Sequence, residues 1–221
     1  MIPASAPLRV RSHLAGAPDG NLPLLHRGRD AVYVEVDGRC IGVVGVRATA
    51  VPCALRTTLD ALDVAAARVE GGVLHLDGEP LVVGRIVEVT TPRLRVEAGA
   101  AAPTPDVRAM VGRGDGLTPY DDDVLCGWLA AHRSAGIATP EADAAVRAHL
   151  GRTTLLSATL LDCAIHGEVI PEFAAFIAAL DTPDEADRAA RLAAVGHSSG
   201  RGLLRGARLA LSHLTPMRGA A

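Results

Sequence analysis

The sequence contains no lysine and very few aromatic residues, which make up 2% of its 221 residues. The net charge is −3, and no run of basic residues is interleaved with aromatic ones. We therefore expect no nucleic-acid binding, because that function requires a basic surface. The scarcity of aromatic residues means that a core must be built mainly from alanine, valine and leucine. The apolar fraction of 49% and the charged fraction of 21% are typical of a globular protein with one large or two small domains.

Long apolar runs are also missing. No window approaches the ~18 apolar residues of a membrane span. The first residues lack the charged segment and apolar run of a secretion signal. We expect a cytoplasmic protein that does not contact a membrane.

Cysteine is scarce and carries no recognisable pattern. Cys40, Cys53, Cys126 and Cys163 are widely spaced, without a CxxC pair or a zinc-binding arrangement. Reduced structural thiols are the preferred interpretation, and a catalytic or disulfide role is the alternative.

The N-terminal half predicts a unit of β-hairpins. Residues 1–30 hold four prolines and are expected to be irregular. From residue 31 apolar and polar residues alternate, and Asp37-Gly38 is typical of a hairpin turn. The expected elements are strands at 31–36, 40–46, 73–76, 81–83 and 85–90, with a short helix at 55–69.

The C-terminal half predicts helices, so the expected class is α+β. Residues 91–109, and 98–105 in particular, are rich in proline and alanine and are interpreted as a connection. The expected domains are a β-rich region, 1–105, and a helical domain, 106–221. Start and stop signals predict helices at 119–134, 141–150, 153–166, 171–180, 183–195 and 200–214.

The helix expected at 119–134 follows a glycine-rich stretch with glycines at 112, 114 and 116. Thr118 is predicted to cap this helix, with Pro119 at its first position and Asp121 three residues after the cap. A glycine-rich loop that leads into a helix N-terminus directs backbone N–H groups outward, which is typical of an anion site.

Asp121, Asp122 and Asp123 can be interpreted in two ways. Acids are favoured in the first turn by the helix dipole, so capping alone would explain them. Alternatively, Asp122 and Asp123 hold a cation such as Mg²⁺, or act as bases or acceptors beside a polar substrate. Successive helical residues are about 100° apart, so at most two of the three can face one ligand.

Two further helices are expected to begin in the same way. Thr153 is predicted to cap one, and Thr154 and Ser157 lie on one of its faces, although such hydroxyls also bond back to the helix backbone. Ser198 or Ser199 is predicted to cap the last helix, after His197.

The stretch 196–200 also matches the G-x-S-x-G nucleophile elbow, which requires a preceding strand. A helix is expected there instead, so a hydrolase using Ser198 is a minor alternative. Arg201, Arg205 and Arg208 share one face of the last helix; only Arg201 is a candidate anion partner.

If these three helix N-termini converge, they form a cradle for a small anion. The catalytic candidates are Asp122, Asp123 and His197. The ligand-binding candidates are Gly112, Gly114, Gly116, Leu117, Thr118, Thr153, Thr154, Ser157, Ser198, Ser199 and Gly200. No metal ligand is assigned.

The motif series, from Gly112-x-Gly-x-Gly-Leu-Thr-Pro-x-x-Asp-Asp123 through Thr153-Thr-x-x-Ser157 to Gly196-His-Ser-Ser-Gly200, resembles that of AllH-type bacterial proteins. The likeness covers about 110–210. It implies a link to oxamate carbamoyltransferase, in which an AllH-type subunit works with two others in anaerobic purine (allantoin) breakdown. The implied reaction converts oxalurate and phosphate to oxamate and carbamoyl phosphate. The sequence departs from the usual family motif at Arg113, Asp115, Tyr120 and Asp121.

We expect a carbamoyltransferase-type enzyme or enzyme subunit that binds a small carboxylate, phosphate or carbamoyl anion, with partner subunits. The alternative is a non-catalytic ligand-binding or assembly subunit of a multi-protein complex.

Overall fold

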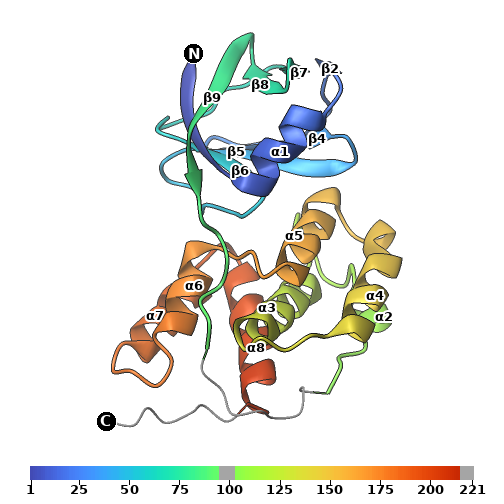
Figure 1. The fold of residues 1–221 in the computed structure, drawn as a ribbon, viewed down its shortest axis with the longest axis vertical. Coiled ribbons are helices and arrows are strands. Elements are labelled where there is room, and N and C mark those ends of the chain that lie inside the picture. Colours follow the sequence, from blue (N-terminus) through green and yellow to red (C-terminus); the bar gives the residue numbers. More distant parts are fainter. Residues whose placement is uncertain (95–102, 215–221) are drawn as a thin grey trace. The chain divides into compact units, whose positions relative to one another are not determined.

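The computed structural model describes residues 1–94 and 103–214. The chain divides into two compact units, Met1–Val89 and Thr90–Ala221. Figure 1 distinguishes them by colour, blue to green for the first unit and green to red for the second. The first unit is rich in strands and the second is helical, so the expected α+β class is confirmed.

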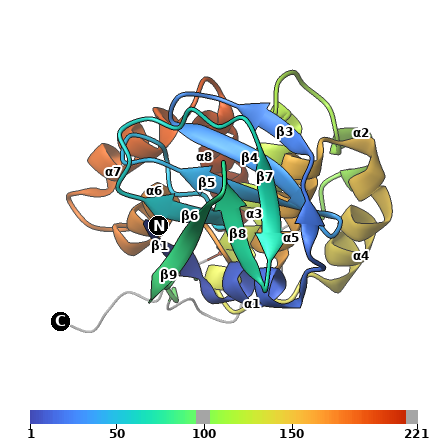
Figure 2. The same cartoon turned by 90° about the horizontal axis from the view of Figure 1, so that it is seen from above.

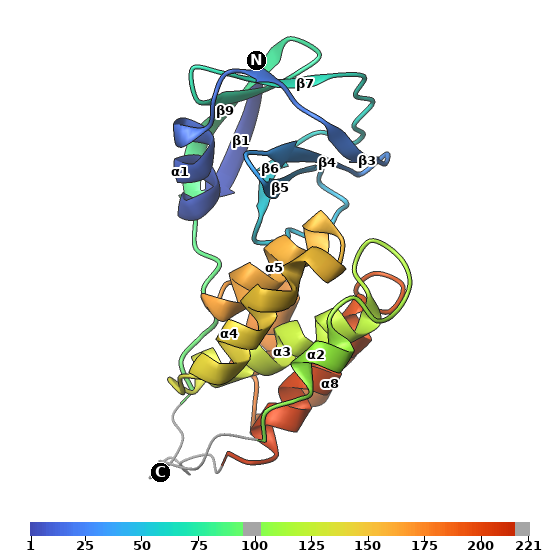
Figure 3. The same cartoon turned by 90° about the vertical axis from the view of Figure 1, so that its right-hand side faces the viewer.

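The N-terminal unit is built on a sheet of nine strands in the order β2-β7-β8-β9-β1-β6-β5-β4-β3. Figure 2 shows β4, β5 and β6 side by side, and Figure 3 shows α1 lying along β1 and β9. The elements are β1 (Ile2–Pro7), α1 (Leu8–Gly16), β2 (Gly20–Asn21), β3 (Leu24–Arg27), β4 (Ala31–Val36), β5 (Arg39–Val44), β6 (Ala54–Thr57), β7 (Ala67–Glu70), β8 (Val73–Leu76) and β9 (Glu79–Val87).

The hairpin β4–β5 confirms the expected pair of strands. Val36 pairs with Arg39 across a turn in which Asp37 and Gly38 have φ values of 43° and 73°. These left-handed values are those of the hairpin turns that match the twist of the strands. Every second side chain of β4 is buried, and these side chains join the core of the unit.

The expectation that residues 1–30 are irregular is wrong. β1 lies between β9 and β6, with α1 directly after it. Pro3 and Pro7 are in register with Val82 and Val87 of β9, but in the ladder with β6 only Ala4 and Ser5, which lie between them, are paired. The prolines therefore remove no N–H from that ladder.

The helix expected at 55–69 is also wrong. This segment holds the strands β6 and β7 and the loop between them. Leu55 and Val69 are fully buried in the core of the sheet. Tertiary packing has overridden a weak local preference. The strands expected at 81–83 and 85–90 form one strand, β9.

The C-terminal unit confirms the helices expected after residue 118, with shifts at their ends. No helix in the described part of the chain is long and apolar enough to cross a membrane. The elements are α2 (Val107–Met110), α3 (Tyr120–Ser134), α4 (Pro140–His149), η1 (Leu150–Arg152), α5 (Leu155–Ile165), α6 (Pro171–Ala178), α7 (Glu185–Ala193) and α8 (Ser199–Leu211).

α3 is the central helix of this unit, since most of its side chains are buried. It packs against α8, α5 and α2. Contact with α8 depends on glycine: a Cβ added at Gly127 or Gly206 would clash with the backbone of the other helix. At Gly202 it would lie 2.7 Å from the Cβ of Asp123. The close approach brings the N-terminus of α8 to the first turn of α3.

The boundary between the units, after Val89, differs from the expected boundary after residue 105. Residues that follow β9 bind the helical unit through their backbone. The N–H of Thr91 donates to Gly167, and that of Leu94 donates to Ser134. Of the connection expected at 98–105, residues 98–102 lie outside the described residues, and α2 begins soon after it.

The four cysteines are buried, and none of them forms a disulfide. Burial raises the pKa of the Cys40 thiol to about 12 and that of the Cys126 thiol well above its ordinary value. Both thiols stay protonated at neutral pH, so neither has the character of a reactive cysteine.

Candidate functional site

The glycine-rich loop between α2 and α3 adopts a conformation that only glycine accepts readily. Gly112, Gly114 and Gly116 have φ values of 80°, 123° and 90°. A Cβ at Gly112 would clash with the carbonyl of Arg152, and one at Gly114 would lie 2.6 Å from the backbone nitrogen of Tyr120. Gly116 has open space around it. The first two glycines therefore allow close packing, and the third serves only the shape of the loop.

The tip of this loop, residues 113–117, is exposed. Within the described part of the chain, the backbone N–H groups of Gly114, Asp115, Gly116 and Leu117 have no hydrogen-bond partner. Successive N–H groups in a glycine-rich loop form a concave donor surface for anions. The loop, rather than the first turn of α3, carries these unused donors.

The buried carboxylate of Asp122 holds the loop, α3 and the start of α5 together. It accepts hydrogen bonds from the N–H of Gly112 at 2.8 Å and from the hydroxyls of Thr153 at 2.5 Å and Ser157 at 2.6 Å. Its exposed fraction is 0%. Both oxygens are engaged, and bonds of this kind are strong because the acceptor is charged.

Asp123 lies at the junction of α3 with the start of α8. The hydroxyls of Thr118 and Ser199, whose oxygens are 2.8 Å apart, are its hydrogen-bond partners. Only 5% of Asp123 is exposed, and among the described residues its Oδ2 has no partner. A buried acceptor of this kind is unusual in a folded protein, so Asp123 stays a candidate site residue.

The pKa of Asp123 is raised to about 7, and burial is the main cause. The neighbouring charge of Asp122 also raises this pKa, whereas the hydrogen bonds from Ser199 and Thr118 lower it. A carboxyl group with a pKa near neutrality can both give and take a proton under physiological conditions.

Thr154, and not Thr153, caps α5. Its hydroxyl oxygen accepts from the N–H of Ser157 at 3.1 Å and donates to the carbonyl of Leu117 at 2.5 Å. Thr153 lies before the cap in extended conformation, so its hydroxyl reaches Asp122 instead. The expected cap is therefore wrong by one residue, and Thr154 also fixes the end of the glycine loop.

The capping box expected at the start of α3 is wrong. Pro119 occupies the N-cap position, and no side chain caps the helix. Asp121 forms an ion pair with Arg113 and its N–H donates to the Arg113 carbonyl at 3.1 Å. The loop folds back over the first turn, so Thr118 is left to bond with Ser199.

At the start of α8, Ser198 is the N-cap residue but makes no capping hydrogen bond. A Cβ at Gly200 would clash with the carbonyl of Leu192, so this glycine serves packing against α7. His197 is exposed. The residues before the G-x-S-x-G stretch form α7 rather than a strand, which removes the geometry of a hydrolase elbow.

The three expected segments therefore meet at the first turn of α3. Asp122 links α3 to α5, and Asp123 links it to α8. The described residues contain no group of three or more histidine, cysteine or acidic side chains that could hold a metal ion. The catalytic and binding roles of the individual residues stay predictions.

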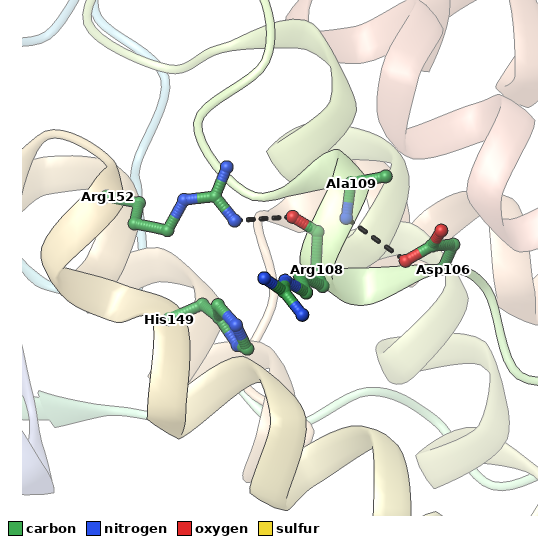
Figure 4. Close-up of a pocket in the computed structure, with 5 residues that line it drawn as sticks. All are labelled: Asp106, Arg108, Ala109, His149 and Arg152. Carbon is green, nitrogen blue, oxygen red and sulfur yellow. Dashed lines mark hydrogen bonds between the residues drawn. The ribbon is translucent and has the colours of Figure 1, made fainter.

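Sequence reasoning missed a pocket of about 630 Å³ beside this region, drawn in Figure 4. It is lined by Asp106, Arg108, Ala109, His149 and Arg152. The only local signal was the position of Arg152, directly before Thr153. Nothing in the spacing of Arg108 and His149 shows that they share a pocket with it.

The helical unit therefore contains a glycine-rich loop that is held by the buried carboxylate of Asp122. A second buried aspartate, Asp123, follows it directly. Residues 110–211 match the family model described as "Oxamate carbamoyltransferase subunit AllH". The resemblance to AllH-type proteins is thus confirmed, and the matched segment runs from the end of α2 to the end of α8. Comparisons with curated proteins and with solved structures found no match.

Proposed function

We propose that the chain is an AllH-like subunit of a cytoplasmic carbamoyltransferase and binds a small carboxylate, phosphate or carbamoyl anion at the glycine loop. The observation that carries this proposal is the row of unused N–H donors from Gly114 to Leu117, adjoining the buried carboxyl of Asp123 through Thr118. An anion at the loop accepts hydrogen bonds from these N–H groups, and no hydrogen bond among the described residues has to break.

The reaction implied by the family name needs two kinds of assistance. A phosphate oxygen bonds to the carbamoyl carbon of oxalurate, and negative charge develops on the carbonyl oxygen. The N–H groups of the loop supply donors for this charge. The C–N bond to oxamate then breaks, and the leaving nitrogen needs a proton.

Asp123 is the residue suited to this proton transfer. With a pKa of about 7, it gives its proton to the leaving nitrogen and regains one from the phosphate hydroxyl, so the protons balance. Asp122 has a positioning role, because its oxygens already accept three bonds. His197 is exposed and remains our second candidate for proton transfer.

The second candidate function is a non-catalytic binding subunit. It is favoured by the word "subunit" in the description of the matching family. Here the loop would hold a ligand, and the chemistry would lie on partner chains. Ligand binding without turnover by the isolated chain supports this alternative, whereas turnover by the isolated chain excludes it.

The test of the binding site is a thermal-shift titration with oxamate, oxalurate and phosphate, each with and without Mg²⁺. Ligand at ~100 times its dissociation constant stabilises the protein by about 2.7 kcal/mol. The loop variant is Gly116→Ala, which has room for the Cβ but is strained at its φ of 90°. Gly78→Ala is the matched control, since Gly78 has a φ of 84° and open space in the other unit.

Loss of the oxamate or oxalurate shift in Gly116→Ala, with the shift retained in Gly78→Ala, supports the proposal. Equal shifts in both variants would remove the loop from ligand binding. A shift that requires Mg²⁺ would assign the acidic residues to a metal.

A further inference from the structure

The pocket of Figure 4 has a composition suited to anions. Arg152 and His149 come from the end of α4 and the turn after it, and Arg108 comes from α2 on the other side. Two guanidinium groups therefore lie in one hollow, each with several N–H donors. Asp106 is the one carboxylate in the lining.

The arginines are not neutralised by their surroundings. Within the described part of the chain, no carboxylate forms an ion pair with Arg108 or Arg152. Asp106 accepts a hydrogen bond from the N–H of Ala109 at 3.1 Å, so it is engaged with its own helix. Two like charges left without a counter-ion in one pocket favour a bound anion with more than one charge.

The pocket is also partly pre-organised. A guanidinium nitrogen of Arg152 donates to the backbone carbonyl of Arg108 at 2.5 Å, which fixes one arginine and leaves its other donors available. Nδ1 of His149 is 2.7 Å from the carbonyl of Ala145. Since a carbonyl only accepts, Nδ1 carries a proton and Nε2 is the ring nitrogen available for a ligand.

We propose that Arg108, His149 and Arg152 form a binding site for a phosphate group, separate from the glycine loop. Arginine presents paired donors that match two phosphate oxygens, and Nε2 of His149 remains available to the same group. This inference goes beyond the proposed function, since none of these residues belongs to the loop or contacts Asp123.

The site is connected to the loop through the backbone. The carbonyl of Arg152 packs against Gly112, and the next residue, Thr153, bonds to Asp122. A phosphate that orders Arg152 therefore stabilises the same turn that supports the glycine loop.

The test is isothermal titration calorimetry of the full chain with inorganic phosphate and with methyl phosphate at constant ionic strength. Binding of inorganic phosphate alone identifies the free ion as the ligand; binding of both identifies the phosphoryl group of a larger molecule. The variant is Arg108→Gln, because the Arg108 side chain has no described partner to lose. Arg147→Gln, an exposed arginine of α4, is the control.

We expect Arg108→Gln to weaken phosphate binding roughly tenfold or more, as expected for loss of a charge-assisted contact, and Arg147→Gln to leave it unchanged. Gly116→Ala is expected to keep phosphate binding while losing oxamate binding, which separates this site from the loop. No phosphate binding by the wild type, equal weakening in both arginine variants, or loss of phosphate binding only in Gly116→Ala would overturn the proposal.

Discussion

The carboxylate of Asp122 accepts a hydrogen bond of 2.6 Å from the hydroxyl of Ser157, which lies 35 residues further along the chain. The same oxygen accepts from Thr153, and the other accepts from the N–H of Gly112. One side chain thus fixes the relative positions of the glycine loop, α3 and α5. The geometry of the candidate site depends on this contact more than on any helix cap.

Asp122→Ala is therefore expected to destabilise the protein by about 3–5 kcal/mol, because it leaves one buried donor and two half-buried donors without their acceptor. Urea denaturation of the two proteins measures the difference in unfolding free energy. Asp121→Ala serves as the control, since the ion-pair partner of Asp121 is an arginine whose side chain is 71% exposed. The control should cost about 1 kcal/mol or less. Equal losses in both variants would contradict the role given to Asp122.

The raised pKa of Asp123 predicts a specific dependence of stability on pH. The folded protein holds this proton up to about pH 7, whereas the unfolded chain releases it near the ordinary value of 3.8. Between these values the folded state binds more protons, so the contribution of Asp123 to stability falls as pH rises. The full change is on the order of 4 kcal/mol.

Asp123→Asn removes this dependence, because the amide does not ionise. The stability of the variant relative to the wild type should rise between pH 5 and pH 8, as measured by denaturation at both values. A relative stability that is the same at the two pH values would show that Asp123 titrates normally.

Turnover measurements distinguish a role of Asp123 in proton transfer from its effect on stability. In the assembled enzyme, Asp123→Asn is expected to lower turnover strongly while the circular dichroism spectrum stays unchanged, and a comparable loss in His197→Ala would transfer the role to the second candidate. The loss would follow from removal of a proton-transfer group, which typically contributes 10²–10⁴-fold. Full activity in both variants would remove the proposed mechanism and leave only the binding role.

The contact between α3 and α8 predicts a strict requirement for glycine. Gly206→Ala places a Cβ against the carbonyl of Val124 and is expected to cost about 1–3 kcal/mol or more through separation of the helices. Gly151→Ala is the control, since its Cβ meets nothing and its φ is not in the left-handed region. Thermal denaturation of both variants distinguishes a steric effect from a general effect of alanine.

Local chemistry in the sequence determined most of the helical unit. Pro140 and Pro171 begin α4 and α6, and Gly167, with φ of 75°, follows α5. The hairpin at Asp37-Gly38 was equally predictable. These signals act between residues that are close in sequence, so the sequence alone contains them.

Which residues meet in the site depends on the packing of the whole chain. β1 was unpredictable because its pairing with β6 and β9 joins distant segments, and the burial of that sheet overrode the prolines and the helical preference of 55–69. The sequence pattern predicted the glycines, hydroxyls and aspartates of the site. The different environments of Asp122, whose hydrogen bonds hold the loop, and Asp123, whose pKa is raised, depend on burial and on partners from α5 and α8. Burial and long-range contacts are properties of the packed chain, and for that reason the pocket of Arg108, His149 and Arg152 had no counterpart in the sequence pattern.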